Sequence, residues 1–475
     1  MGRLIVVSNR VNIPQPGVAA AGGLAVALQA ALRKYHGIWF GWSGEVVETT
    51  NSSIHRIEQD GITFATIDLG VEDHDNYYNG FANRTLWPLF HYRTDLTYYD
   101  RKFDSTYFRV NALFAHALAP MIEPDDVIWV HDYHLIGCAE ELRRMGFTNR
   151  MGFFLHIPFP AAEVLLTLPN HEALVRGLFG FDVVGFQTES DLRALQEYVI
   201  YEAGGFVDED MRMTAFGRTI RGGVFPIGID VDEVVDMAAT DEAEAHRNRM
   251  LQSMAGRNLI IGVDRLDYTK GLPNRLKAFE HLLEAYPENR GKVSLLQVAP
   301  SSRMDVPEYV DIRQELESES GRINGRFAEF DWVPIRYLNK SFTRAALTGL
   351  FRASAIGLVT PLRDGMNLVA KEYVAAQAPE NPGVLVLSRF AGAAHEMDAA
   401  LIVNPYDTDD VVDAVQRGLN LAVEERIERW QSLMTTLRDQ NVHVWRDNFV
   451  AALRDARATA LGGPAPRRAP VDETV

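Results

Sequence analysis

The sequence predicts two doubly wound α/β domains. Short apolar runs rich in β-branched residues, such as "RLIVVS", "DVIWVHD" and "KVSLLQVAP", alternate with amphipathic stretches over most of the 475 residues. Strands that are continuously apolar and separated by helices indicate parallel sheets covered on both faces. The alternation stops at a polar helical stretch near residues 232–252 and restarts at "NLIIGVD". Two such series predict two domains, with ligands expected at the carboxyl ends of the strands.

The domain limits follow from that interruption. We place the boundary near Asp230, so that residues 1–230 form an N-terminal domain and residues 231–445 a C-terminal domain. The stretch "VHVWRDNFVAALRDARATAL" predicts a final helix, assigned to residues 446–460, which we expect to pack on the N-terminal domain. Residues 461–475 include "GGPAPRRAP", a glycine- and proline-rich composition that predicts disorder.

Composition limits the classes of partner. Lysine and arginine number 47 and aspartate and glutamate 64, so the formal net charge is −17. Such a chain repels polyanions, and nucleic acid and anionic membranes are therefore poor candidates for partners. Cys138 is the only cysteine, which excludes an intrachain disulfide and fits a cytoplasmic location. The sequence contains neither a recognisable signal peptide nor an apolar run of membrane-spanning length.

In the N-terminal half, polar groups follow the predicted strands. Arg10 ends the first strand, and the pair Gly22 and Gly23 then opens a helix whose N-terminus would favour an anionic or oxygen-rich ligand. A tight loop chosen for packing explains the glycines equally well. The loop does not match G-x-G-x-x-G, so a dinucleotide site is weakly supported.

Two aromatic segments, "WFGWSGE" and "YYNGFANRTLWPLFHYR", are predicted as loops whose rings could pack on sugar faces. Half-buried aromatic residues of a loop are the alternative. "HDYH" (His131–His134) and "HIPFP" (His156–Pro160) follow two further strands. Their spacing matches no zinc motif, so hydrogen bonding to a polyol is favoured over metal binding. For His134 an ordinary surface histidine is the better interpretation.

In the C-terminal half, "DRLDYTKGLP" places Arg265 and Lys270 on one loop, followed by Pro273 at a position suited to the first turn of a helix. Two cations beside a helix N-terminus predict a diphosphate site, although most arginines and lysines are simply surface charges. The loop is not a P-loop. Arg303, in "APSSR", ends another strand and could add a third cation.

"VTPLRDGMNLVAKEY" combines a strand end, two carboxylates and a helix. Asp364 precedes the helix, and Glu372 lies about two turns inside it. Between them, backbone amides could hold a phosphate at the helix N-terminus. A sugar, a diphosphate and a ribose would fit this order of groups. The alternative for Asp364 is a helix cap, and the alternative for Glu372 is an ion pair on the helix surface. Taken together with Arg265 and Lys270, the two carboxylates favour a binding site over these alternatives.

The motifs together resemble a known family. They are "VVSNR", "GGL", "WFGWSGE", "LWPLFHYR", "WVHDYHL", "FFLHIPFP", "GFQT", "PIGID", "DRLDYTKGLP", "GRINGR", "VTPLRDGMNLVAKEYVAAQ" and "FAGAA". In this order they are similar to the trehalose-6-phosphate synthase family, retaining glycosyltransferases of the GT-B fold. That fold consists of two Rossmann-like doubly wound domains that face each other across a cleft.

The resemblance implies UDP-glucose as donor, glucose 6-phosphate as acceptor, and α,α-trehalose 6-phosphate and UDP as products. It implies that acceptor contacts come from Arg10, Tyr78, Trp87, Asp132 and Arg303. It implies donor contacts from Gly23, Arg265, Lys270, Asp364, Met366, Asn367, Leu368, Val369 and Glu372. The residues nearest the chemistry would be Asp132, His156, Arg265, Lys270 and Asp364.

The resemblance also implies a mechanism. A retaining enzyme would ordinarily use a carboxylate nucleophile. In this family, front-face attack is favoured, with the departing phosphate taking the acceptor's proton. No cofactor or metal is expected, and the expected assembly is a homo-oligomer, a dimer or a tetramer. The alternatives are a pseudo-glycosyltransferase, a relative that uses a GDP or ADP donor, a non-catalytic regulatory paralogue and a nicotinamide-dependent dehydrogenase.

Overall fold

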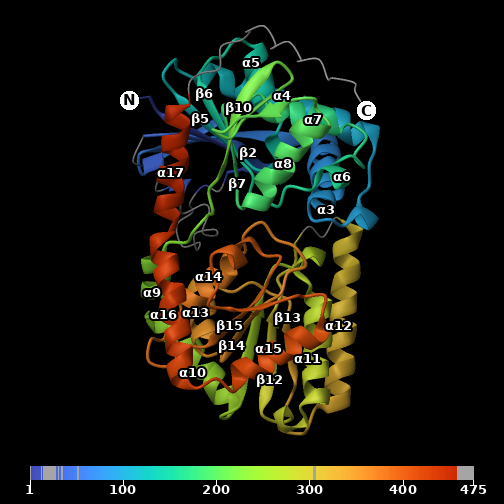
Figure 1. Ribbon diagram of the computed structural model, residues 1–475, viewed down its shortest axis with the longest axis vertical. Helices are drawn as coiled ribbons and strands as arrows, with labels where there is room; N and C mark the ends of the chain where they lie inside the picture. The colour runs from blue at the N-terminus through green and yellow to red at the C-terminus, as the bar shows by residue number, and fades with distance from the viewer. Residues whose placement is uncertain are drawn as a thin grey trace, which may run out of the picture.

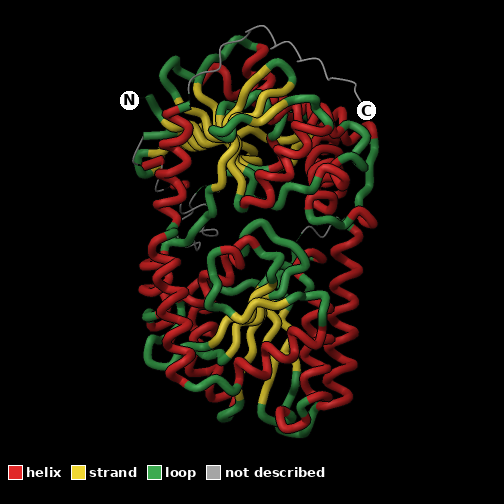
Figure 2. The backbone as a smooth tube through the Cα atoms, viewed as in Figure 1, coloured by secondary structure: helices red, strands yellow, loops and turns green. Residues whose placement is uncertain are grey.

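The computed structural model describes residues 2–11, 13, 28–29, 32–33, 36–50, 53–302 and 306–456. Figures 1 and 2 show two α/β halves, one above the other, each with a twisted sheet between helices. The predicted class of two doubly wound α/β domains is confirmed. Gly22, Gly23, Arg303 and the predicted disordered segment 461–475 lie outside the described residues.

The first sheet has ten strands in the order β3-β4-β2-β1-β5-β6-β7-β10-β9-β8. The seven strands from β4 to β10 in this order are parallel, and β3, β9 and β8 pair antiparallel at the two edges. The strands are β1 (Leu4–Arg10), β2 (Ile38–Val47), β3 (His55–Gln59), β4 (Ile62–Gly70), β5 (Val127–His131), β6 (Arg150–Phe154), β7 (Val183–Phe186), β8 (Phe206–Val207), β9 (Arg212–Ala215) and β10 (Arg218–Val224).

The second sheet has six strands, all parallel, in the order β13-β12-β11-β14-β15-β16. Every residue of β12, β14 and β15 is buried, as expected of apolar strands covered on both faces. The strands are β11 (Asn258–Val263), β12 (Val293–Val298), β13 (Ile335–Leu338), β14 (Ile356–Val359), β15 (Val384–Ser388) and β16 (Leu401–Val403).

Helices connect the strands in both halves. Those of the first half are α2 (Val71–Asp73), η1 (His74–Leu86), α3 (Trp87–Phe90), η2 (Thr94–Leu96), α4 (Arg101–Leu118), η3 (Ala119–Met121), η4 (Tyr133–Leu135), α5 (Cys138–Arg144), α6 (Ala162–Leu165), α7 (His171–Leu178) and α8 (Glu189–Tyr201). Those that follow are α9 (Val231–Ala238), α10 (Asp241–Met254), η5 (Tyr268–Lys270), α11 (Leu272–Ala285), η6 (Pro287–Asn289), α12 (Pro307–Phe327), α13 (Arg344–Arg352), α14 (Leu368–Ala375), η7 (Gly392–His395), α15 (Thr408–Leu419), α16 (Val423–Asp439) and α17 (Val442–Asp455).

Local sequence signals set several of these boundaries. The polar stretch near 232–252 forms α9 and α10, whose N-caps Asp230 and Thr240 each accept a hydrogen bond from a first-turn amide. Thr188 and Asp191 form a reciprocal capping box at the start of α8. Pro273 lies in the first turn of α11, as predicted.

Both predicted loops have regular secondary structure. "WFGWSGE" lies in β2, so the prediction of a loop is wrong there. The aromatic segment that begins at Tyr77 belongs to a continuous helical run, α2–η1–α3, whose central thirteen residues have π-helical hydrogen bonding. The prediction of a loop is therefore wrong over η1 and α3. A π-helix is wider than an α-helix, so apolar residues on one face do not recur at the 3.6-residue spacing that reveals helices in a sequence.

The last helix crosses from the second half to the first. In Figure 1, α17 lies against the side of the upper sheet. Phe449 stacks on Trp129 of β5 with ring centroids 4.6 Å apart, and Trp445 lies 5.0 Å from the same ring. A Cβ atom added to Gly152 or Gly185 would lie 2.8 or 2.7 Å from the Phe449 ring, so these glycines provide the space for it. The exact domain limits stay a prediction.

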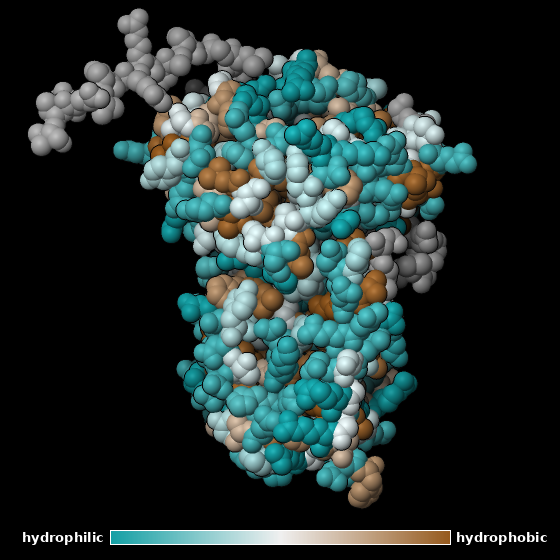
Figure 3. All heavy atoms as spheres, turned by 90° about the vertical axis from the view of Figure 1, so that its right-hand side faces the viewer, coloured by the Kyte–Doolittle hydropathy of each residue, from teal (hydrophilic) through white to brown (hydrophobic). Residues whose placement is uncertain are grey.

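In the described part of the chain, no helix is both long and apolar enough to span a bilayer. Figure 3 shows a face on which hydrophilic residues predominate and hydrophobic ones occur in small groups.

The packing of α17 yields a test of stability. Truncating the fully buried Phe449 to alanine should lower the free energy of unfolding by about 3–5 kcal/mol, because it leaves a cavity beside Trp129. Val444→Ala on the same helix, where the side chain is 37% exposed, is the matched control and should cost far less. Urea denaturation followed by tryptophan fluorescence measures both, and equal losses would contradict this role of α17.

Candidate active site

Arg10 and Tyr78 both approach Trp42. Arg10 is the exposed last residue of β1, and its guanidinium carbon lies 5.9 Å from the centroid of the Trp42 ring. Gly44, at φ +96°, leaves room for that side chain, since a Cβ there would lie 2.6 Å from an Arg10 nitrogen. Tyr78 lies 5.5 Å from Trp42, centroid to centroid, and is stacked on His134. His134 is buried, so the prediction of an ordinary surface histidine is wrong.

Asp132 is held in a strained backbone conformation. It follows β5 and has φ 75° and ψ 163°, a region that is populated almost only by glycine and costs about 1–3 kcal/mol for other residues. Its amide donates to the carbonyl of Phe154, and its Oδ1 accepts a 3.3 Å hydrogen bond from the amide of His156. The two predicted residues are therefore fixed side by side at neighbouring strand ends.

His156 has a buried partner that the motif analysis did not assign. Its Nε2 lies 3.0 Å from Nδ1 of His131, the last residue of β5. Burial lowers the pKa of His156 to about 3 and holds the pKa of His131 well below its usual value. Both rings are therefore uncharged at neutral pH, and His156 offers hydrogen bonds rather than charge. His131 ends β5, and His156 lies two residues after the end of the adjacent parallel strand β6. This placement after consecutive strands is the sequence signal that could have paired them.

In the second half, the two loops predicted to bind the donor meet directly. Lys270, at the end of η5, donates from Nζ to Oδ2 of Asp364 over 2.5 Å. The side chain of Asn367 donates to the same oxygen over 3.0 Å. Lys270 is only 9% exposed, so its ammonium is held in place rather than free in solvent.

The start of α14 is built around Asn367. This residue is the N-cap, at φ 76°, and its Oδ1 accepts from the amide of Ala370. Asp364 is therefore not the cap, which removes the structural alternative considered for it. The amides of Leu368 and Val369 belong to the first turn and have no acceptor within the helix. Met366 is buried directly before them.

Glu372 lies in the second turn of α14, half-buried. Burial raises its pKa, the positive charge of Arg344 acts in the opposite direction, and Glu233 adds to the rise. Arg344 itself binds Glu233 at 2.8 Å. Within the described residues, no side-chain hydrogen bond or ion pair joins Glu372 to another predicted site residue.

Contacts across the interdomain junction bring the two sets together. The Arg265 guanidinium lies 5.7 Å from the centroid of the Trp87 ring. Arg363 lies 3.7 Å from the Tyr92 ring in the same way. The backbone of Gly365 is so close to His156 that a Cβ at this glycine would lie 2.1 Å from the His156 carbonyl oxygen.

A buried ion pair supports the Lys270 loop from behind. Arg275 of α11, 1% exposed, donates to Asp264 over 2.8 Å and to Thr360 over 3.2 Å. Asp264 directly follows β11 and Thr360 directly follows β14, so the two residues lie where the loops that carry Arg265 and Asp364 begin. Burial raises the pKa of Asp264, and Arg275 opposes that rise. This pair was not predicted, because nothing local in the sequence distinguishes Arg275 from a surface helix residue.

Two predicted site residues, Gly23 and Arg303, lie outside the described residues. Within the described ranges, no group of three or more histidine, cysteine, aspartate or glutamate side chains has an arrangement suited to a metal ion. The candidate site therefore contains fixed cations, neutral histidines, carboxylates and the N-terminus of a helix.

Two Rossmann-like domains whose polar strand ends meet at one site define a glycosyltransferase of the GT-B class. A model of glycosyltransferase family 20 matches residues 7–455. The chain belongs to this family, and the resemblance predicted from its motifs is confirmed.

Relatives match over nearly the whole chain. A trehalose-6-phosphate synthase of Sinorhizobium fredii is 51% identical, with 95% of this chain and 98% of the relative covered. An α,α-trehalose-phosphate synthase (UDP-forming) of Burkholderia xenovorans, solved in complex with glucose 6-phosphate, is 54% identical, with 95% and 100% covered and a TM-score of 0.91. An E. coli structure described as bound with UDP-2-fluoro glucose is 46% identical, with 96% and 99% covered and a TM-score of 0.91.

The strain at Asp132 gives a testable separation of stability from activity. Asp132→Gly should leave the free energy of unfolding unchanged or raise it by up to about 2 kcal/mol, because relieved strain offsets one lost hydrogen bond. Turnover should fall at least tenfold. Met211→Gly, at another positive φ (59°) on an exposed loop, is the control and should keep full activity. A clear loss of stability in Asp132→Gly would show that this aspartate is structural.

Proposed function

We propose that the protein transfers glucose from UDP-glucose to glucose 6-phosphate with retention, forming α,α-trehalose 6-phosphate and UDP. The observation that carries this proposal is the Lys270–Asp364 pair at the start of α14, opposite Asp132 and His156. The relatives named above are trehalose-6-phosphate synthases, and one of them was solved with glucose 6-phosphate. The E. coli structure is described as holding a fluorinated UDP-glucose.

The donor diphosphate would lie between the cations and the helix. An ammonium group has three donors, so Lys270 can bind Asp364 and still donate twice to phosphate oxygens. Arg265, exposed beside Trp87, would bind the diphosphate from the other side. The first-turn amides at Leu368 and Val369 would add further donors, which is the ordinary way in which helix N-termini bind phosphate.

The two sugar units of the donor would be held at opposite ends of that site. Asp364, through its Oδ1, together with Met366, Asn367 and Gly23, would hold the glucose. Glu372 would accept from the ribose hydroxyls. Its raised pKa marks a carboxylate that burial disfavours, and two hydroxyl donors would stabilise its charged form.

The acceptor would bind on the N-terminal domain. Arg10, Tyr78, Trp87 and Arg303 are the proposed phosphate ligands. Asp132 and His156 would bind hydroxyl groups near the reacting carbons. Because a phosphate gripped from Arg10 and from the second-domain residue Arg303 would bridge the domains, acceptor binding would favour a closed site from which water is excluded.

The chemistry would rest on stabilising the leaving group. As the glycosidic bond breaks, negative charge grows on UDP, where Arg265, Lys270 and the helix amides would receive it. His156 is a very weak base, with a pKa of about 3. It is therefore poorly suited to take the proton of the attacking hydroxyl, which favours transfer of that proton to the departing phosphate. Homo-oligomerisation and a cytoplasmic location stay predictions.

The function itself is tested by substrate and product. Initial rates with glucose 6-phosphate should be highest with UDP-glucose and much lower with GDP- or ADP-glucose, and plain glucose should be a poor acceptor. The product should be an α,α-linked, non-reducing disaccharide phosphate by nuclear magnetic resonance. A product without a glycosidic bond, or no turnover with any of these donors, would overturn the proposal.

The role of Lys270 is tested by calorimetry with UDP. A charge-assisted hydrogen bond contributes roughly 1.5–3 kcal/mol, so Lys270→Ala should weaken UDP binding about ten- to a hundredfold. Arg265→Ala should behave similarly. Lys277→Ala, an exposed lysine in α11 that lies near Glu315, is the matched control and should bind UDP normally. Unchanged affinity in both test variants would remove the diphosphate assignment.

Turnover should survive chelation. Fixed cations and helix amides can supply the positive charge that many nucleotide-sugar enzymes obtain from a divalent ion. Rates measured before and after dialysis against EDTA should agree within about twofold, an allowance of roughly 0.4 kcal/mol. Loss of activity that is restored by Mg²⁺ or Mn²⁺ would show that a metal is required.

A further inference from the structure

A cavity of about 510 Å³ lies in the C-terminal domain, beside the amino ends of the strands of the second sheet. The candidate active site lies at their carboxyl ends. The cavity is lined at the amino ends of the strands, by Asn258 at the start of β11, Ala355 just before β14 and Gly383 just before β15. All six strands are parallel, so the loops with Arg265 and Asp364, which follow β11 and β14, leave the sheet at the opposite ends of the strands. The cavity is therefore separate from the donor site.

Four arginines line this cavity, which we call the arginine cavity: Arg247, Arg257, Arg352 and Arg426. None of its lining residues is acidic. Arg352 donates only to the carbonyls of Ala238 and Ala376, each at 3.0 Å. Arg426 donates to the Pro382 carbonyl and the Asn381 side chain, each at 2.7 Å. Within the described residues, neither arginine forms an ion pair with a carboxylate.

The other two arginines each have a carboxylate partner. Arg247 binds Glu244 at 3.0 Å, but its Nε is buried and has no hydrogen-bond partner in the described chain. Arg257 binds Asp331 at 2.5 Å. Buried donors without acceptors are uncommon, because each costs free energy comparable to a lost hydrogen bond.

The positive charges also repel one another. Burial and the neighbouring Arg247 lower the pKa of Arg352, and Glu244 and Glu380 act in the opposite direction. Arg336, behind the cavity, has its pKa lowered by burial and by Arg257. One carboxylate, Glu244, acts on both Arg247 and Arg352. Guanidinium groups gathered in this way suit an anion such as phosphate. The cluster occurs although the chain as a whole carries a charge of −17.

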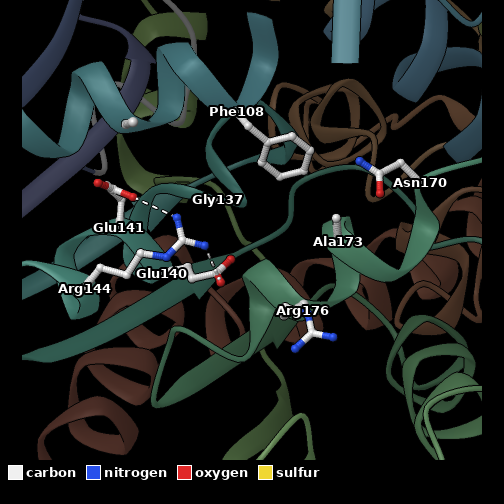
Figure 4. Close-up of a pocket in the computed structure, with 9 residues that line it drawn as sticks. Phe108, Gly137, Glu140, Glu141, Arg144, Asn170, Ala173 and Arg176 are labelled. Atoms are coloured by element: carbon white, nitrogen blue, oxygen red, sulfur yellow. Dashed lines mark hydrogen bonds and ion pairs between the residues drawn. The ribbon is translucent and has the colours of Figure 1, made fainter. Parts of the chain in front are cut away.

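A second cavity serves as a comparison, because its arginines are paired with carboxylates. About 230 Å³ in volume, it lies between α4, α5 and α7. Figure 4 shows Arg144 bound to both Glu140 and Glu141 at its wall. Arg176, which lines the cavity from α7, pairs with Glu172. The cations of that cavity already have carboxylate partners, so the same argument for an anion does not apply.

We propose that the arginine cavity binds a small phosphorylated metabolite. Arg247, Arg352 and Arg426 would hold its phosphate, and the lining residues Leu251, Leu419 and Leu421 would contact its uncharged part. The volume lies within the range of about 300–1,000 Å³ that is typical of small-molecule sites. Arginine rather than lysine suits this task, since its planar fork binds phosphate oxygens in pairs.

The test uses pyrophosphate and AMP as probes, titrated calorimetrically into the full-length protein. Each titration is repeated with Lys270→Ala, which weakens phosphate binding at the candidate active site and so separates that site from the cavity. Both probes should still bind, and Arg247→Gln and Arg426→Gln should each weaken them at least tenfold, the effect of losing one charge-assisted hydrogen bond. Arg249→Gln, an exposed neighbour on α10 that does not line the cavity, is the matched control and should bind within twofold of the wild type.

Turnover with UDP-glucose checks that the variants are folded, because neither Arg247 nor Arg426 belongs to the candidate active site. Equal probe affinity in the wild type and both variants would overturn the proposal. So would the absence of binding by both probes to the wild type. If the arginines only cap helix ends, the variants should lower the melting temperature and leave probe binding unchanged, which also overturns it.

Discussion

The candidate site depends on one close approach between the two domains. The backbone of Gly365 lies against the carbonyl of His156, where any Cβ would meet the oxygen at 2.1 Å. Only glycine fits at that distance, and the contact sets the spacing between the Asp364 loop and the Asp132–His156 strand ends. Lys270 is positioned in turn by its bond to Asp364. Because Gly365 has no side chain, the two domains approach closely enough for the donor groups of one to face the acceptor groups of the other.

Charge at this junction comes from arginine and lysine, not from histidine. Burial lowers the pKa of His91 to about 4 and that of His156 to about 3. These two histidines therefore carry no charge around neutral pH. Histidines of the unfolded chain protonate near pH 6.5, whereas these two do so only well below it. Their neutral burial therefore favours the folded state above pH 6.5, and this contribution is lost progressively as the pH falls towards the folded values.

Much of the fold and many of the site residues could be predicted, because apolar strands and the polar residues that end them are local features of the sequence. Lys270 and Asp364 were predicted for one site, and they touch. Three features could not be predicted. The π-helical register of η1 hides its periodicity, the positive φ of Asp132 has no glycine to mark it, and the Asp264–Arg275 pair depends on tertiary packing. His131 was quoted in a motif, and the one signal of its contact with His156 was that both residues come at the ends of consecutive predicted strands, which pair as β5 and β6.

The return of α17 to the first sheet affects how the chain is made as well as how it is held together. Gly152 and Gly185 leave gaps that Phe449 fills, and Phe449 is synthesised more than 250 residues after Gly185. At about 5–20 residues per second, the growing N-terminal domain would wait some tens of seconds for the last piece of its core. During that interval it would expose apolar surface beside Trp129, to which a chaperone could bind. Completion of the second domain and sealing of the first would then be one event.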